Sequence, residues 1–526
     1  MFEFEKLDKN PILWTDGYKV CHKDQYPAGL SWVYQTWTPR KSRVPGVNHV
    51  CFFGLQGALG EMTQSFKENF FERDVEFVVK SYEEEIKNIF WETNRHFVDN
   101  HKSTHIRELH KLGYLPIRVK ALPEGAFVPI GCPMFTIENT LPNFYWLPGY
   151  LETQLSAYIW QPMTAATTAD FYRRILSHYA ALTTDDISRV FFQAGDFSMR
   201  GMPSPEVGYR TGAGHLTSFG VSATISARKY LRTFYDADYD VMRYTPSTEH
   251  SVMCSYGEKE IEAFRHLITV VHPSGNLSIV SDTYDFWNIV DVVLPALKKE
   301  IMNRHGKILI RPDSGEPVDI ICGKVVYMVD DKGNKCKAQP ESESIEKGLV
   351  ERLWEIFGGI VNHKGFRELD PHIGVVYGDS ITPDRAIRIC KGLMSKGFAT
   401  INAILGIGSF TYQYNTRDTF GFALKGTAEI EYETFKMIFK NPKTDNDNFK
   451  KSQKGMVAVI WNNIKEDWEM KDCLTPEDVE VMGETNCLRD FYIDGKFVYI
   501  NKFDAIRDRI KYESNRIYKS KPELYQ

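Results

Sequence analysis

The sequence predicts an α/β protein whose parallel sheet, open or closed into a barrel, carries the functional residues. Between about residues 165 and 420, short apolar segments alternate with helical stretches, which is the pattern of parallel βαβ units. From 115 to 150 the apolar runs are short and cut by Pro and Gly, which indicates a second, β-rich region. A length of 526 residues, of which 43% are apolar, allows two or more domains with sizeable cores.

The individual elements follow from local periodicity. Residues 61–114 carry apolar side chains at helical spacing and predict amphipathic helices. Further helices are predicted at 257–272, 284–304 and 383–397, and strands at 190–194, 277–281, 307–311 and 373–377, and a short apolar run at 404–410 ends in glycine and serine. The segments 322–347 and 491–500 predict hairpins, the second with Asp494-Gly495 at its turn.

Charge and cysteine content exclude several classes of protein. A net charge of −5 without blocks of like charge argues against a general nucleic-acid or anionic-membrane binder. The nine cysteines are scattered and never in CxxC spacing, which argues against a zinc site or disulfide scaffold and favours a reducing compartment. The N-terminus has no signal-peptide pattern, and no apolar run reaches membrane length. We therefore expect a cytoplasmic protein.

Six successive segments of the alternating half end in residues that can carry chemistry. These residues are Asp196, Phe197 and Arg200; Glu249 and His250; Asp282 and Asp285; Arg311 and Asp313; Gly378 and Asp379; and Gly408 and Ser409. Any single Asp here would most simply be a helix N-cap, a lone His structural and Phe197 a core residue. The repetition favours a site instead, because a parallel sheet brings equivalent strand ends together.

This mixture of side chains suits a phosphorylated sugar joined to a heterocycle. Arg200 and Arg311, with backbone amides near Ser409, suit phosphate oxygens. Carboxylates suit ribose hydroxyls and Mg²⁺, Phe197 offers a face for stacking, and His250 can pass a proton or phosphoryl group near neutral pH. A glycoside hydrolase would have little use for the arginines. The GxxxxGK[ST] and GxGxxG signatures are absent.

Several strings occur in the order and approximate spacing of one known family. They include "TDGYKVCHKDQYP" (15–27), "GDFSMRG", "EHSVMCSYG" (249–257), "IVSDTYDFWN" (279–288), "IRPDSGEPVD" (310–319) and "TRDTFGFALK" (416–425). The chain thus resembles the nicotinamide phosphoribosyltransferase family, among the type II phosphoribosyltransferases. The resemblance implies an atypical α/β barrel (181–424), and a second β-rich α+β domain in which 1–180 and 425–526 pack together and dimerise.

The resemblance also implies an activity. Nicotinamide and phosphoribosyl pyrophosphate would give nicotinamide mononucleotide and pyrophosphate in NAD salvage, with Mg²⁺ and with ATP hydrolysed through a phosphohistidine. The expected assembly is a homodimer with shared active sites.

Residue roles come from the same resemblance. Phe197 and Tyr18 of the partner subunit would stack on the pyridine ring. Arg311 would lie by the ring amide and the ribose phosphate, Arg200 by the phosphate and Asp313 by the ribose or the pyridine. Gly378 and Asp379 would bind ribose hydroxyls, Gly408 and Ser409 the 5′-phosphate, and Arg40, Arg417 and Lys425 the pyrophosphate. His250 would be phosphorylated and Asp282 would orient it. From the residues alone, Tyr18 fits a capped short helix and Arg40 a solvated basic loop.

Three positions depart from the family pattern. Ala223 stands where the family has an aspartate that reads the ring carboxamide, Ser409 replaces a glycine, and Tyr244 is large for the edge of the pyridine tunnel. Ala223 can neither accept a hydrogen bond from the ring carboxamide nor repel a carboxylate. Nicotinate therefore remains an alternative substrate. A weakly active binding or regulatory homologue is the third possibility. The joint retention of His250, Asp282, Arg311 and Asp313 argues against it, because a pure binder needs no phosphorylatable histidine.

Overall fold

The protein forms two compact units, seen here in a computed structural model. The structure describes residues 7–325, 327–329, 335–337, 343–378, 380–444, 451–518 and 521. Unit 1 takes the described residues of Met1–Thr164, Thr233–Ala237 and Thr416–Glu513, and unit 2 those of Ala165–Arg232, Asp238–Asn415 and Ser514–Gln526. Each unit has its own sheet, with one large apolar cluster in each half of the fold.

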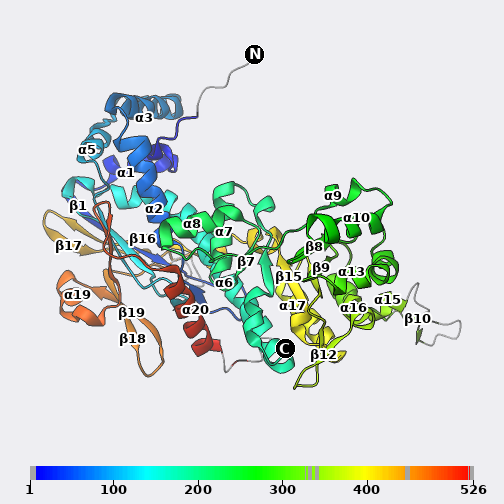
Figure 1. Ribbon diagram of the computed structural model, residues 1–526. Helices are drawn as coiled ribbons and strands as arrows, with labels where there is room; N and C mark the ends of the chain where they lie inside the picture. Colours follow the sequence, from blue (N-terminus) through cyan, green and yellow to red (C-terminus); the bar gives the residue numbers. More distant parts are fainter. Residues whose placement is uncertain are drawn as a thin grey trace, which may run out of the picture. The chain divides into compact units, whose positions relative to one another are not determined.

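Unit 2 contains a six-stranded parallel sheet in the order β7-β6-β15-β14-β9-β8 (Figure 1). Every adjacent pair in it is parallel. Its strands are β6 (Ala194–Asp196), β7 (Val221–Ser222), β8 (Leu277–Val280), β9 (Ile308–Arg311), β14 (Ile373–Tyr377) and β15 (Ala403–Ile407). The strands are short and apolar because both faces of such a sheet are covered.

An irregular segment joins the two edge strands of this sheet. Val221 of β7 bridges in parallel to Arg243, and Ser278 of β8 bridges in parallel to Ser247. The N–H of Arg243 donates to Gly220 O at 2.9 Å, and the N–H of Ser278 donates to Pro246 O at 2.9 Å. Residues 243–247 therefore take the place of a further strand between β7 and β8. The α/β barrel expected from the sequence is thus present in an atypical form.

Helices surround the sheet of unit 2, and several of those labelled in green and yellow lie beside it in Figure 1. Helices formed wholly or partly by this unit are α6 (Leu147–Thr183), α7 (Pro205–Leu216), α8 (Ile225–Tyr235), α9 (His250–Cys254), α10 (Glu260–His266), α14 (Pro317–Cys322), α15 (Glu343–Lys347), α16 (Leu349–Phe357), α17 (Pro383–Ser395) and α18 (Ser409–Gln413). Ile310 and Val375 from the sheet are fully buried in one cluster with Leu353 of α16 and Leu393 of α17. Two hairpins, β10 (Tyr327–Val329) with β11 (Lys335–Lys337) and β12 (Gly359–Val361) with β13 (Arg367–Leu369), complete it.

Two local predictions need correction. The strand expected at 190–194 is the 3₁₀ turn η4 (Ile187–Phe192), and β6 begins only at Ala194. The helix expected at 284–304 is divided into α11 (Phe286–Asn288), the π-helical η7 (Ile289–Val293), α12 (Leu294–Ala296) and α13 (Lys298–Met302). Pro295 explains the break, because proline has no N–H to donate and a π turn accommodates the missing bond.

Unit 1 is built on a seven-stranded sheet in the order β17-β16-β1-β5-β3-β20-β21, whose paired strands are antiparallel. Its strands are β1 (Leu30–Thr38), β3 (Ile117–Ala121), β5 (Phe135–Asn139), β16 (Ala423–Glu431), β17 (Thr434–Met437), β20 (Arg489–Ile493) and β21 (Lys496–Phe497). The second β-rich α+β domain is thus confirmed. Trp37 stacks between Phe135 and Phe422 at centroid distances of 5.7 and 5.5 Å, which makes a dense aromatic core.

Helices and smaller strand pairs accompany this sheet. The helices are α1 (Gly17–Gln25), α2 (Leu55–Phe66), α3 (Val75–Phe90), α4 (Arg95–Asn100), α5 (Thr104–Leu112), α19 (Pro476–Met482) and most of α20 (Phe503–Tyr518). β2 (His49–Cys51) pairs with β4 (Phe127–Pro129), and β18 (Met456–Asn462) with β19 (Asp467–Leu474). The helices predicted over 61–114 and the hairpin at Asp494-Gly495 are confirmed, and both turn residues have positive φ.

Among the described residues, no helix combines the length and the apolarity needed to cross a membrane.

Candidate active site

The parallel registers of unit 2 bring the predicted strand-end residues to one edge of the sheet. Val280 pairs with Arg311, Ile310 with Val375, Tyr377 with Leu405, and Ile407 with Asp196. The residues that follow these positions therefore leave the sheet at similar levels. They are Phe197, Ala223, Asp282, Asp313, Gly378, Gly408 and Ser409, with Arg311 as the last residue of β9.

A charged network runs along this edge. Arg311 Nη2 lies 3.3 Å from Asp313 Oδ2. The N–H of Asp313 donates to Asp282 Oδ2 at 2.9 Å, and Asp282 Oδ1 lies 3.1 Å from Nε2 of His250. His250 is about half exposed, whereas the Asp282 side chain is 3% exposed. A buried carboxylate thus contacts an accessible imidazole, an arrangement that orients the ring.

The ionisation of Asp282 reflects competing influences. Burial alone raises the pKa of this carboxyl, but hydrogen bonds from Ser314, from the N–H of Asp313 and from His250 outweigh burial and leave the pKa below its usual value. Asp282 therefore stays ionised at neutral pH and can accept a hydrogen bond from Nε2 of His250.

The turn after β9 is rigid. Tyr377 Oη donates to the carbonyl oxygens of Ser314 and Gly315, each at 2.9 Å. Gly315 has φ +87°, in the region that favours glycine. A Cβ on Gly378 would lie 2.1 Å from Asp313 Oδ1, so only glycine there leaves room for the Asp313 carboxylate. Asp379, the other residue predicted at this strand end, lies outside the described residues.

Phe197 covers the mouth of the barrel. A Cβ on Gly406 of β15 would come within 2.6 Å of its ring, so the phenyl packs closely against a strand that has no side chain at that point. The ring of Tyr244 meets Phe197 edge-on, with centroids 6.2 Å apart. Phe197 is half-buried and Tyr244 is 45% exposed. One aromatic face is thereby available for a flat ligand.

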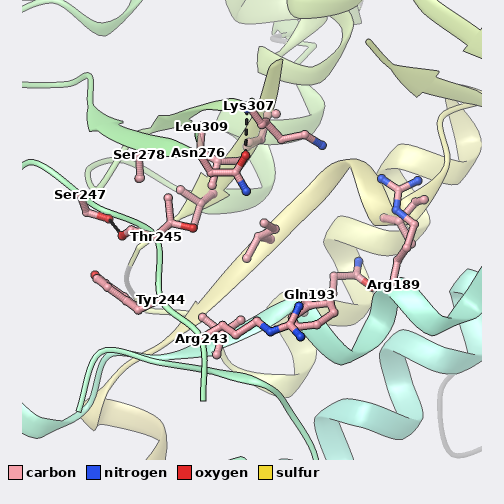
Figure 2. A pocket seen from close by; sticks show the side chains of 18 of the residues that line it. Arg189, Gln193, Arg243, Tyr244, Thr245, Ser247, Asn276, Ser278, Lys307 and Leu309 are labelled. Carbon is pink, nitrogen blue, oxygen red and sulfur yellow. Dashed lines mark hydrogen bonds between the residues drawn. The ribbon is translucent and has the colours of Figure 1, made fainter. Parts of the chain in front are cut away.

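Behind Phe197 the barrel encloses a cavity of about 580 Å³ (Figure 2). Its lining includes Phe197, Val221, Tyr244, Gln193, Ser278, Lys307 and Leu309, and it extends to the amino ends of the strands. Gly195 and Gly374 stand on the strands that line it. A Cβ on Gly374 would lie 3.0 Å from Leu309, and one on Gly195 would lie 3.2 Å from Val221. These glycines therefore make room for neighbouring side chains that line the cavity.

Polar groups lie around this cavity. Gln193 Oε1 and Ser278 Oγ are buried without a hydrogen-bond partner among the described residues. Burial lowers the pKa of Lys307, and the charge of Arg189 lowers it further. Asp370 and Glu368 oppose this effect. The far part of the cavity is therefore able to solvate a polar ligand.

Ser409 and Arg200 meet across Gly201. A Cβ on Gly201 would lie 2.1 Å from Ser409 Oγ, so the hydroxyl packs directly on the turn that presents Arg200. Arg200 is exposed, Ser409 is half-buried, and Gly408 is buried directly before α18. The structure thus brings together the residues predicted for phosphate.

Ala223 lies on a connection fixed by Asp196. The N–H of Ala223 donates to Asp196 O at 2.8 Å. The buried Asp196 carboxylate accepts from the hydroxyls of Ser198, Ser222 and Thr224 at 2.6–2.8 Å. Asp196 is therefore committed to holding the backbone, and the exposed methyl of Ala223 offers no polar group in its place.

The remaining predicted residues belong to unit 1. Tyr18 on α1 is 60% exposed, with its hydroxyl 3.4 Å from Asp16. Arg40 Nε donates to Gly421 O at 3.0 Å, and Arg417 is half-exposed. Lys425 Nζ lies 3.4 Å from Glu152 Oε1.

The charges of these residues influence one another's ionisation. Burial lowers the pKa of Lys425; Arg40 and Lys19 add to this effect and Glu152 opposes it. Burial raises the pKa of Tyr18. The charges of Asp16 and Glu152 raise it further, and that of Arg417 lowers it. No sequence pattern singled out Glu152 or Lys19, because each is an ordinary charged residue of a helix.

Comparison with known proteins agrees with this geometry. The model of the nicotinate phosphoribosyltransferase (NAPRTase) family matches residues 192–485, and that of the nicotinamide phosphoribosyltransferase N-terminal domain matches residues 10–108. The nicotinamide phosphoribosyltransferase of Acinetobacter baylyi is 40% identical over 517 residues, covering 95% of this chain and 97% of the relative. That of Mycoplasma pneumoniae is 35% identical over 335 residues, covering 63% and 69%.

A solved structure supports the fold. The nicotinate-nucleotide pyrophosphorylase of Pyrococcus furiosus aligns with a TM-score of 0.54 at 14% identity, over 98% of this chain and 99% of that one. The barrel, the strand-end residues, the family model over residues 192–485 and a relative that matches 95% of the chain lead to one conclusion: the chain belongs to the nicotinate phosphoribosyltransferase family.

Proposed function

We propose that the protein is a nicotinamide phosphoribosyltransferase of the cytoplasm, which makes nicotinamide mononucleotide and pyrophosphate from nicotinamide and phosphoribosyl pyrophosphate in NAD salvage. The observation that carries the proposal is the network Arg311–Asp313–Asp282–His250 beside the open face of Phe197. The names of its relatives support the same substrate.

The strand-end residues suit this transfer. Phe197 would stack on the pyridine, and Arg311, held by Asp313, would orient the ring amide and the ribose phosphate. Arg200 and Ser409 would bind the 5′-phosphate. As pyrophosphate leaves, the sugar gains positive character and the leaving group negative charge, so preset charges at both ends stabilise the transition state.

Mg²⁺ fits these residues if it arrives with the substrate. No group of three or more His, Cys, Asp or Glu side chains suited to a metal occurs among the described residues. Mg²⁺ commonly keeps several waters and binds one or two carboxylates together with substrate phosphates. Asp313 is the carboxylate best placed to share it. The ion would neutralise charge on the departing pyrophosphate.

We further propose that ATP phosphorylates His250. The imidazole is accessible, and Asp282 holds Nε2, which leaves Nδ1 as the nitrogen not engaged by that carboxylate. His250→Ala should abolish the stimulation of turnover by ATP and leave the ATP-independent rate largely unchanged. Equal ATP stimulation in wild type and His250→Ala would contradict this role. Measurement of mononucleotide formation with and without ATP decides it.

The unit 1 residues fit a homodimer with shared sites. Tyr18 of the partner subunit would cover the second face of the pyridine, and Arg40, Arg417 and Lys425 would meet the pyrophosphate. The support is their grouping in unit 1, where Tyr18 is exposed, Arg417 is about half exposed, and Lys425 is partly buried beside Glu152.

Nicotinate is the second candidate substrate. Ala223 carries no charge that would repel a carboxylate, and Asp196 beside it is occupied by three hydroxyls. The deciding experiment measures mononucleotide formation from phosphoribosyl pyrophosphate and Mg²⁺ with each base, with and without ATP. A preference for nicotinamide is expected. A preference for nicotinate would replace the proposed substrate, and no product from either base would favour a binding or regulatory protein.

A further inference from the structure

One carboxylate, Glu152, stands among the cations of unit 1. It lies in the second turn of α6. Its Oε2 is 2.6 Å from Lys19 Nζ on α1, and its Oε1 is 3.4 Å from Lys425 Nζ on β16. The side chains of Lys19, Glu152 and Lys425 are 5%, 18% and 35% exposed. Glu152 thus links three elements that are far apart in the sequence.

The same turn of α6 also holds the start of α1. Thr153 Oγ1 donates to Asp16 Oδ2 at 2.7 Å, and the Tyr18 hydroxyl lies 3.4 Å from the same oxygen. Two consecutive residues of α6 therefore fix Lys19 and the residue before α1. The position of Tyr18 follows from these contacts.

A negative charge at this place needs a reason. By charge alone, a carboxylate next to Lys425 weakens the binding of an anion. The shorter contact is to Lys19, so Lys19 compensates most of the charge of Glu152 while Lys425 is held at a longer distance. Lys425 is then fixed in position and keeps its own charge for a ligand.

We propose that Glu152 is a positioning residue that fixes Lys425 for the pyrophosphate group, with Lys19 as its neutralising partner. The inference rests on the proposed function. It concerns the pyrophosphate end of phosphoribosyl pyrophosphate, and it leaves binding of the pyridine base unaffected.

The test uses the full chain and inorganic pyrophosphate with Mg²⁺, measured by isothermal titration calorimetry. Glu152→Gln should weaken pyrophosphate binding about tenfold, since losing a hydrogen bond to a charged group costs about 1.5 kcal/mol. KM for phosphoribosyl pyrophosphate should rise by a similar factor, and KM for nicotinamide should stay constant. Charge alone predicts the opposite sign for Glu152→Gln, which is tighter pyrophosphate binding.

Two further variants complete the design. Glu152→Asp keeps the charge and shortens the arm by one methylene, so positioning predicts a partial loss of affinity and charge alone predicts none. It also serves if Glu152→Gln fails to fold. Glu84→Gln is the matched control, because Glu84 forms an exposed pair with Lys80 at 3.6 Å, and it should change nothing.

The outcomes separate the two proposals. If the wild type forms no mononucleotide and binds no pyrophosphate, the proposed function fails. If the wild type does both, and the Glu152 variants bind pyrophosphate as tightly or more tightly, only the role of Glu152 is overturned. A fall in kcat with both KM values unchanged would likewise indicate a merely structural residue.

Discussion

The two units place their charged residues in different ways. In unit 2, parallel strands deliver Asp282, Arg311 and Asp313 to one edge, because parallel registers align the strand ends. In unit 1, the cations come from a helix, from the end of β1, from a turn and from the middle of β16, and Glu152 joins two of them. Regular topology organises the first group, and individual ion pairs organise the second.

Their interiors differ as well. The barrel of unit 2 is hollow, with a cavity of about 580 Å³. The sheet of unit 1 is filled by aromatic stacking around Trp37. We therefore expect substitutions at the strand ends to affect turnover, and substitutions in the core of unit 1 to affect stability.

The largest effect is expected from a variant that breaks the strand-end network. Asp313→Ala frees Arg311 and removes the carboxylate for which Gly378 leaves room. A misplaced arginine should lower kcat/KM by a factor on the order of 100 or more. Steady-state mononucleotide formation measures it. Asp319→Asn, which alters a carboxylate paired with Lys324 at 2.9 Å, is the control; equal kinetics for both variants would show that the network is not used.

A second effect should appear in the stability of unit 1. Glu124 is 1% exposed, and its carboxylate accepts from the N–H groups of Gly54 and Gln56. Burial raises its pKa from 4.5 to about 7, although these bonds oppose the rise. The native state then binds more protons than the unfolded state, so stability is present below pH 4.5 and is lost as pH rises through 7.

The loss from Glu124 should be about 3 kcal/mol, at 1.36 kcal/mol for each pH unit. Glu124→Gln should remove this pH dependence, whatever its absolute effect on stability. Urea unfolding of wild type and variant between pH 4.5 and 8 measures the difference. A constant difference across that range would contradict the shifted ionisation.

The smallest effect concerns the choice of base. Ala223→Asp adds a carboxylate near the mouth of the barrel. It should raise KM for nicotinate about tenfold or more relative to nicotinamide, because like charges repel in a partly desolvated site. Ala223→Asn has nearly the same shape without charge and should not do so. An equal response of both bases to Ala223→Asp would place Ala223 away from the carboxamide.

Sequence patterns predicted much of the unit 2 site because its signals are local. Apolar runs such as Ile373–Tyr377 mark strands, and the polar residue after each run marks the edge where parallel strands meet. The strand predicted at 190–194 was wrong because an apolar run of that length also fits a 3₁₀ turn. Periodicity alone does not separate the two.

The sequence by itself determined the α/β class, the strand-end residues and the family resemblance, because these depend on periodicity and on strings of neighbouring residues. Only the tertiary structure decided that residues 243–247 complete the barrel, that the barrel is hollow, and that Glu152 joins Lys19 to Lys425. It also decided that α6 passes from unit 1 to unit 2 between Thr164 and Ala165. Contacts between residues that are not neighbours in the sequence leave no local pattern, so packing alone creates them.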